Sequence, residues 1–235
     1  MNAKLEEIRM SVTPSIKVPP LESGDRLTRQ EFERRYDAAP RIKKAELIEG
    51  VVYVASPLRF TNHAEPHSSI ITWLGVYRAA TPGVRLGDNP TVRLDLDNEP
   101  QPDAILRLEP EAGGKSRITD DDYVEGAPEL IVEIAASTAA YDLNDKLRAY
   151  RRNEVQEYLV WQRYENRLDW FSLQEGVYVP FTPDETGIIR SQVFPGLWLA
   201  VSALLNGDLA TVLSELQKGL ASEEHQKFCD RLRNP

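Results

Sequence analysis

The chain has 235 residues, 41% of them hydrophobic and 28% charged, with a formal net charge of -9. This composition is typical of one globular domain with a sizeable core. The net charge argues against a broad basic surface for nucleic acid but leaves room for a local basic cleft, and no apolar run reaches the roughly 18 residues of a membrane span. The single cysteine excludes an internal disulfide and the N-terminus lacks a signal-peptide pattern, so we expect a cytoplasmic protein without a membrane segment.

The first part of the chain is predicted to be an arm followed by short elements. Residues 1–22 are punctuated by prolines and lack periodicity, which favours a flexible N-terminal arm. A capping-box pattern at Thr28 predicts a helix over 27–38. Residues 45–54 are typical of two strands that turn at Glu49 and Gly50.

The middle of the chain is expected to alternate strands and helices. Apolar residues at helical spacing predict an amphipathic helix over 67–80. Strand patterns follow, and a polar loop separates the second strand from the third. The predicted order is strand 91–96, strand 103–108, loop 109–126, strand 129–135, a helix from Ser137 or Thr138 to about 153, and strand 155–162.

The last third is predicted to be a meander followed by a helical tail. Strands are expected at 167–173, 177–181 and 188–193, with turns between them, and 195–199 should be a final structural segment. Residues 204–233 should be largely helical, with an apolar side of the kind that often docks on a second subunit. The leucines and valine on that side are Leu209, Val212, Leu213, Leu216 and Leu220.

Glu133 is the strongest candidate for a functional residue, because it lies inside the apolar run 130–135. A carboxylate in a buried strand costs several kcal/mol unless a cation or strong donors lie beside it. Strand alternation places Glu133 on the same face as Ile131 and Ala135. We therefore expect a positively charged partner on that face.

Three residues of the following helix supply that partner and its neighbours. Lys146 lies one turn after Asp142 and one turn before Tyr150, so the three share a helix face that can turn toward the strand. Asp142 with Lys146 could instead be a modest surface ion pair, and Tyr150 could simply pack in the core.

Two acids and a lysine are what metal-dependent phosphodiester hydrolysis needs. Asp103, Glu133 and the backbone carbonyl of Ile134 form a plausible ligand set for Mg²⁺ or Mn²⁺, which would activate an attacking water. Lys146 would orient or deprotonate that water, or hold the developing negative charge. Alone, Asp103 could be a turn or cap residue.

Two more residues are ambiguous. Glu46 could be a further acid at the site or the solvent face of an edge strand. His67 could contact phosphate or cap its helix, and its spacing from His63 invites a zinc interpretation that neither a cysteine nor a His-Glu-x-x-His pattern supports.

Taken together, these motifs resemble the Uma-type family of putative restriction endonucleases, a bacterial group within the PD-(D/E)xK superfamily. The resemblance runs from about residue 27 to 204 and depends on the order and spacing of its pieces. These are the runs 46–50, 56–57, 102–103, 127–134, 137–138, 155–160 and 195–197, with His67, Asp142, Lys146 and Tyr150.

The resemblance implies an α/β (α+β) fold: a restriction-endonuclease-like core with a mixed β-sheet flanked by helices, added antiparallel strands and a C-terminal helix. It implies that residues 23–204 form the nuclease-like domain and 205–235 a helical tail, and that the protein is a homodimer. Asp103, Glu133 and Lys146 match the family's acid, acid and migrated lysine, since Ala135 stands where the literal motif has its lysine. Glu46 matches a further acidic position.

Three functions are compatible with these residues. The first is a divalent-metal-dependent endonuclease acting on DNA. The second is a catalytically silent nuclease-like module that binds nucleic acid or protein, which the acidic net charge and Ala135 favour. The third is a metal-dependent hydrolase of another phosphoester.

Overall fold

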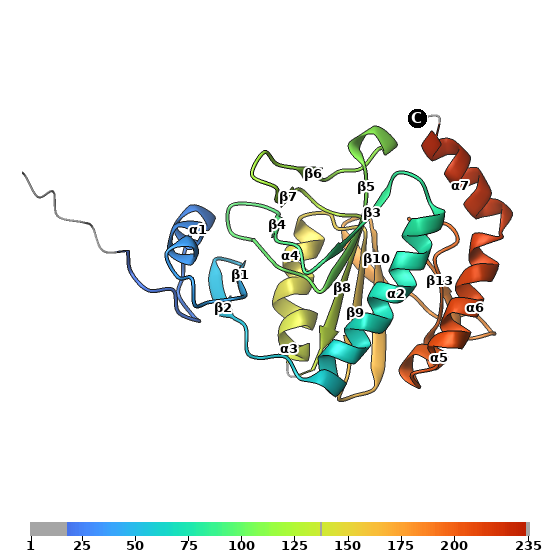
Figure 1. The fold of residues 1–235 in the computed structure, drawn as a ribbon, viewed down its shortest axis with the longest axis horizontal. Coiled ribbons are helices and arrows are strands. Elements are labelled where there is room, and N and C mark those ends of the chain that lie inside the picture. The colour runs from blue at the N-terminus through green and yellow to red at the C-terminus, as the bar shows by residue number, and fades with distance from the viewer. Residues whose placement is uncertain (1–17, 137, 234–235) are drawn as a thin grey trace, which may run out of the picture.

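The structure, a computed structural model, describes residues 18–136 and 138–233 (Figure 1). Residues 1–17 of the arm predicted over 1–22 lie outside the described residues. In the described part Leu21 is buried against Phe32 and Leu47, so this end of the predicted arm packs on the protein. The division at 23 and 205 stays a prediction. None of the helices in the described ranges is long and apolar enough to cross a membrane.

A six-stranded mixed sheet forms the centre of the molecule. Its strand order is β11, β10, β9, β8, β5, β3, in which β8 and β9 are parallel and every other neighbouring pair is antiparallel. The bounds are β3 Val84–Asp88, β5 Ala104–Leu108, β8 Leu130–Ala135, β9 Glu157–Gln162, β10 Arg167–Gln174 and β11 Val177–Pro180. The predicted mixed sheet is confirmed.

Strand β8 is buried along its whole length because helices cover both of its faces. Its residues alternate as predicted: Leu130, Val132 and Ile134 belong to one hydrophobic cluster, while Ile131 and Ala135 belong to another. Glu133 therefore faces the second cluster.

The helices are divided between the two faces of the sheet. The first face packs against α2 and the C-terminal helices, and the second against the helical stretch that follows β8 (Figure 1). The bounds are α2 Glu65–Ala80, α5 Val201–Leu205, α6 Leu209–Leu220 and α7 Glu223–Arg233 on the first face, and α3 Ala139–Tyr141, η3 Asp142–Lys146 and α4 Leu147–Arg152 on the second.

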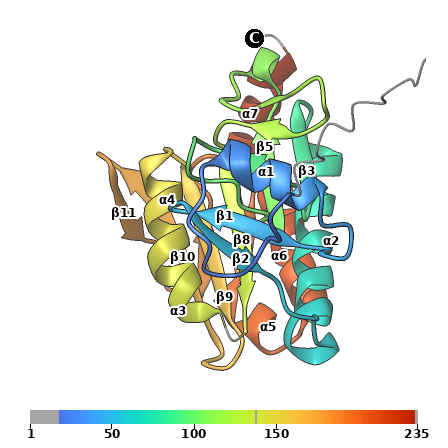
Figure 2. The same cartoon turned by 90° about the vertical axis from the view of Figure 1, so that its left-hand side faces the viewer.

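The remaining elements are short. A hairpin of β1 and β2 turns at Glu49 and Gly50, both with positive φ, which is the turn that the sequence predicts. Figure 2 shows this hairpin lying across the second face, between α4 and α2. The bounds are α1 Arg29–Asp37, β1 Ala45–Ile48, β2 Val51–Val54, η1 Phe60–Ala64, β4 Val92–Arg93, η2 Pro110–Ala112, β6 Arg117–Ile118, β7 Val124–Glu125, β12 Ile188–Arg190 and β13 Trp198–Ala200.

Several predicted elements differ from the structure. Strand β3 was missed because it is short and interrupted by Gly87, where a Cβ would lie 2.9 Å from Ile105 of the next strand. The strands predicted at 91–96 and 188–193 are only β4 and β12. The loop predicted at 109–126 contains η2, β6 and β7.

The tail is three helices, and its apolar side is buried within its own chain. Gly207 (φ 76°) separates α5 from α6, and Asp208 caps α6 by accepting from the backbone N–H of Thr211 (3.0 Å). Val212 and Leu216 belong to the core cluster that also contains α2. Because the apolar side of the tail is covered within its own chain, the tail gives no argument for a homodimer, and the homodimer stays a prediction.

Candidate active site

Asp103 and Glu133 lie side by side on neighbouring strands. The antiparallel register pairs Ala104 of β5 with Val132 of β8, and one further step places Asp103 opposite Glu133 on the same face. Both residues are buried, at 3% and 4% exposure. The structure thus brings together the two acids that the sequence predicts.

Lys146 reaches Glu133 from the helical stretch after β8. Its Nζ donates to Oε1 of Glu133 at 2.8 Å, and the Tyr150 hydroxyl donates to the same oxygen at 2.8 Å. Tyr150 also packs in the core, so both parts of its interpretation hold. Two donors on one oxygen are the compensation that a carboxylate in an apolar strand requires.

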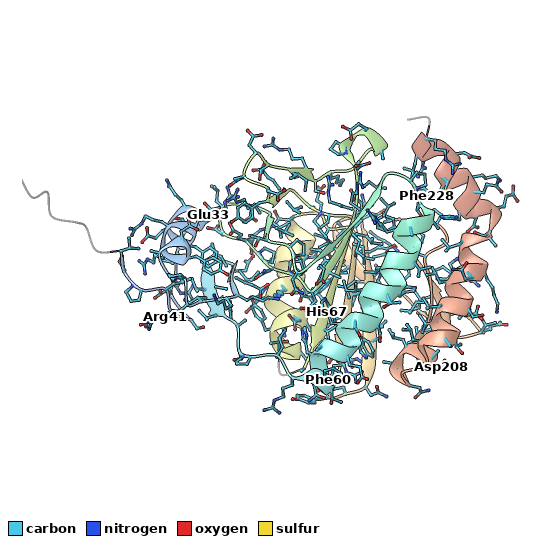
Figure 3. All side chains as sticks on the ribbon, viewed as in Figure 1. Glu33, Arg41, Phe60, His67, Asp208 and Phe228 are labelled. Carbon is cyan, nitrogen blue, oxygen red and sulfur yellow. The ribbon has the colours of Figure 1, made fainter. Side chains whose placement is uncertain are left out.

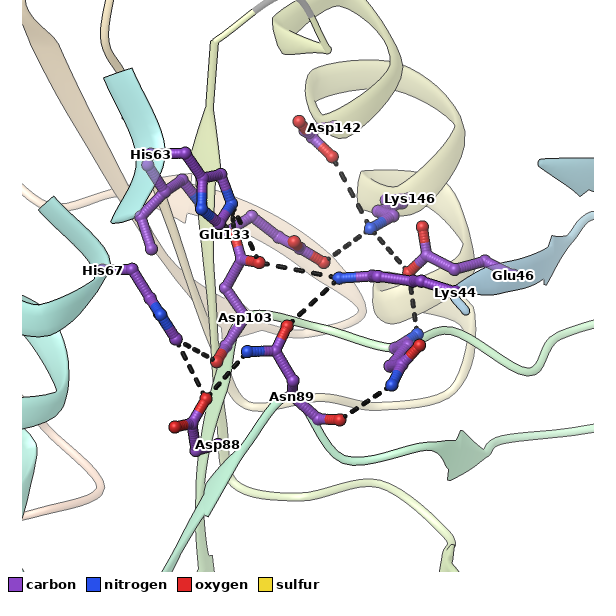
Figure 4. Close-up of polar contacts among 12 residues, drawn as sticks. Lys44, Glu46, His63, His67, Asp88, Asn89, Asp103, Glu133, Asp142 and Lys146 are labelled. Carbon is purple, nitrogen blue, oxygen red and sulfur yellow. Dashed lines mark hydrogen bonds and ion pairs between the residues drawn. The ribbon is translucent and has the colours of Figure 1, made fainter. Parts of the chain in front are cut away.

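Two further carboxylates surround the same ammonium group (Figure 4). Lys146 Nζ lies 2.9 Å from Glu46 Oε1 and 3.7 Å from Asp142 Oδ1. Glu46 also accepts from the backbone N–H of Gln101 at 2.7 Å. The surface interpretations of Glu46 and of the Asp142–Lys146 pair are therefore wrong, because all of these side chains are buried.

The turn that carries Asp142 and Lys146 is π-helical rather than α-helical. It is η3, and the second π-helical segment, η1, carries His63. Single π-helical turns inside helices are rare, and those that do occur often lie at functional sites. Asp142, Lys146 and Tyr150 nevertheless all turn inward, as their spacing predicts.

Asp103 is held by donors from three directions. The backbone N–H of Ile134 donates to its Oδ2 at 2.8 Å, and His63 Nε2 lies 3.1 Å from the same oxygen. Lys44 Nζ lies 3.6 Å from Oδ1. Asp103 is therefore a bridging residue between strands and helix, not a turn or cap.

His67 lies in the first turn of α2, at the same end as Phe60 (Figure 3). Its Nε2 lies 2.9 Å from the Asp103 carbonyl oxygen and 3.2 Å from Asp88 Oδ1. No side chain caps α2, so the capping interpretation is wrong. His67 instead ties α2 to the start of β5 and the end of β3.

Burial and the neighbouring charges shift the pKa values of the site residues in different directions. Burial raises the pKa of Glu133 to about 8 although Lys146 opposes this shift, and burial raises the pKa of Asp142 to about 6. Burial also acts on Asp103, but the His63 hydrogen bond and the charge of Lys44 outweigh it and lower its pKa to about 2. Burial opposes the charge of Lys146, yet the three carboxylates hold its pKa well above the ordinary value.

The donor set suits a hard divalent cation. Asp103 and Glu133 supply carboxylate oxygens. If the register of β5 and β8 is continued by two residues, Ile134 comes opposite Pro102, which has no N–H to donate to the Ile134 carbonyl. Within the described ranges, no group of three or more His, Cys, Asp or Glu side chains is arranged around a metal position. An ion here would thus depend on two carboxylates, a carbonyl and water, as Mg²⁺ commonly does.

Two residues of the site are not predicted from the sequence. Lys44 is not identified at all, and His63 is not identified as a partner of Asp103. Lys44 precedes Glu46 by two, and this strand spacing could have indicated that both face the same site. His63 was considered only for zinc. The two histidine rings lie 5.8 Å apart and contact different atoms of Asp103.

A mixed sheet flanked by helices on both faces is the architecture of a restriction-endonuclease-like fold. Comparison with known families agrees: the model of the Uma2 family, described as "Putative restriction endonuclease", matches residues 29–202. The chain belongs to this family.

A solved structure supports the same fold. It is described as a putative nuclease belonging to DUF820 from Anabaena variabilis ATCC 29413, and it superposes with a TM-score of 0.52 at 13% sequence identity. The match covers 69% of this chain and 89% of that one. No curated protein matches this chain.

Proposed function

We propose that this protein is a divalent-metal-dependent endonuclease that hydrolyses DNA phosphodiester bonds. The observation that carries the proposal is the convergence of Asp103, Glu133 and Lys146 on one face of the sheet, with Lys146 2.8 Å from Glu133. Family membership and the solved nuclease-like fold support it.

Each residue has a distinct task in this proposal. Asp103 and Glu133, with the Ile134 carbonyl, would hold Mg²⁺ or Mn²⁺, which lowers the pKa of a bound water and offsets phosphate charge. Tyr150 and Lys146 fix the orientation of the Glu133 carboxylate. Lys146 keeps Glu133, Glu46 and Asp142 together despite their mutual repulsion.

His63 and His67 position the side chain and the backbone of Asp103, respectively. His63 contacts the carboxylate, and His67 contacts the backbone carbonyl of the same residue. The strand start is thereby fixed relative to α2. This rigidity matters because a carboxylate misplaced by a fraction of an ångström is a poor metal ligand.

The test is DNA cleavage by the purified protein. Supercoiled plasmid and linear duplex should be cut with Mg²⁺ or Mn²⁺ and left intact with EDTA, and D103N, E133Q and K146M should abolish cutting. The matched control is E157Q, a buried acid of β9 that bonds Ser191 and Gln192 outside the site and should keep activity. Cleavage by none of the preparations would refute the proposal. A parallel assay with bis(p-nitrophenyl) phosphate detects a hydrolase of other phosphoesters.

One observation favours the silent module as a second candidate. Asp103, Glu133, Asp142 and Lys146 are each at most 4% exposed, and the hairpin of β1 and β2 lies across their face. A substrate phosphate would need this hairpin to move. If duplex DNA binds without metal and K146M binds it equally well, the silent module is the better description.

A further inference from the structure

Lys44 is a second lysine at the site, and it approaches from the hairpin side. Its Nζ lies 3.6 Å from Asp103 Oδ1 and donates to the side-chain oxygen of Asn89 at 3.3 Å (Figure 4). The residue immediately precedes β1, and its backbone carbonyl accepts from the N–H of Ala55 at 3.0 Å. Its main chain is therefore anchored while its side chain extends toward the acids.

The two lysines differ in how much of their charge is already used. The Lys146 side chain is 4% exposed and contacts three carboxylates, whereas the Lys44 side chain is 22% exposed and contacts one. The side chain of His63, the other basic residue that contacts the Asp103 carboxylate, is 11% exposed. Lys44 is thus the cation of this site that a negatively charged ligand can reach with the least rearrangement.

Asn89 aims the Lys44 side chain. Asn89 has a φ of 51°, a conformation that asparagine tolerates better than most residues. Its N–H donates to the Asp103 carbonyl at 3.1 Å, and its own carbonyl accepts from Gln101 Nε2 at 3.0 Å. The amide oxygen that accepts the hydrogen bond from Lys44 is consequently fixed relative to Asp103.

We infer that Lys44 binds a non-bridging oxygen of the substrate phosphate beside Asp103. The inference rests on the proposed function and names the residue that touches the substrate. As the water oxygen bonds to phosphorus, the bond from phosphorus to the leaving deoxyribose oxygen breaks. Negative charge then redistributes over the phosphate oxygens, and an ammonium group held beside them stabilises that charge. The attacking water releases one proton to solvent, the leaving oxygen takes one from solvent, and Lys44 keeps its own. Lys146 then serves the acids, and Lys44 serves the phosphate.

The test compares three variants: K44M, K44R and K43M. Lys43 is the matched control, because it is an exposed lysine one position away whose Nζ donates to the Pro40 carbonyl. Loss of one charge-stabilising donor should lower the kcat of K44M for plasmid cleavage by about 100-fold. K44R should recover part of the rate, whereas K43M should cut like the wild type. K44M should keep the circular dichroism spectrum and the single cooperative melting transition of K43M, which excludes misfolding, although the loss of the Lys44 charge beside buried Asp103 should lower its melting temperature.

A binding measurement separates this inference from the proposed function. Thymidine 5′-monophosphate is titrated by calorimetry in the presence of Mn²⁺, and K44M should bind it at least ~10-fold more weakly than K43M does, the loss of one charge-assisted bond. DNA cleavage that survives in K44M overturns the Lys44 inference alone. Absent cleavage with Lys44-dependent nucleotide binding overturns the endonuclease alone. Equal nucleotide binding by K44M and K43M overturns the inference whether or not DNA is cut.

Discussion

Replacing Lys146 by methionine should destabilise the metal-free protein strongly. The ammonium contacts Glu133 at 2.8 Å, Glu46 at 2.9 Å and Asp142 at 3.7 Å, and all four side chains are at most 10% exposed. Methionine keeps the apolar stem but leaves buried acids uncompensated, which typically costs about 3–5 kcal/mol of the free energy of unfolding. Part of this loss is relieved by protonation of Glu133, whose pKa burial already raises to about 8. Since that relief requires protons, the loss should grow as the pH rises.

The assay is urea unfolding in EDTA, in mildly acidic and mildly alkaline buffer. K43M serves as the exposed-lysine control, and the K146M/E133Q double variant should recover much of the loss because it removes one of the uncompensated charges. Excess Mg²⁺ or Mn²⁺ should stabilise K146M more than the wild type, by mass action on a more acidic site. A loss below about 1 kcal/mol, the range of an exposed ion pair, would refute the charge-balance reasoning.

Three further predictions concern the scaffold. D208A removes the α6 cap and should cost about 1 kcal/mol in urea unfolding. G219A places a Cβ in overlap with the Gly196 carbonyl oxygen, and it should cost about 1–3 kcal/mol or more in the same measurement. Burial raises the pKa of Glu157 from 4.5 to about 7 although Ser191 donates to it. As the pH rises, the Glu157 carboxyl group therefore loses its proton at a lower pH in the unfolded chain than in the folded protein. The stability of the wild type relative to E157Q should therefore fall by about 3 kcal/mol between pH 4.5 and 7, and a constant difference would contradict the assignment.

The part of the site that could be predicted is the part encoded locally. Glu133 stands out because the apolar run around it cannot accommodate a carboxylate without a partner. Lys146 follows from the spacing of a single helical stretch, in which residues four apart share a face. Both features need only a short window of sequence, and the structure places Lys146 on Glu133.

The part that could not be predicted depends on contacts between distant segments. His63 is 40 residues from Asp103, and Lys44 is 45 residues from the asparagine that aims it. The only local signal for Lys44 is its strand spacing from Glu46, and His63 has only its spacing from His67. Their contacts with Asp103 and Asn89 form only when the hairpin and η1 pack against the start of β5. Strand β3 was missed for a related reason: Gly87 weakens its strand signal but permits the close approach of Ile105.

The position of Lys146 explains why this site tolerates alanine at position 135. Ala135 is the last residue of β8 and packs in the second cluster, on the face that Glu133 shares. A lysine there would extend from the same strand as Glu133, whereas Lys146 enters from η3 and meets Glu133, Glu46 and Asp142 together. Because those acids come from β8, β1 and η3, one ammonium fastens the hairpin and the helical stretch to the sheet. The contact between Lys146 and Glu46 therefore contributes both to charge balance and to holding the hairpin in place, beside the backbone bonds between Leu47 and Glu99. Under the proposed function, an opening of the hairpin for a substrate would have to separate Glu46 from Lys146.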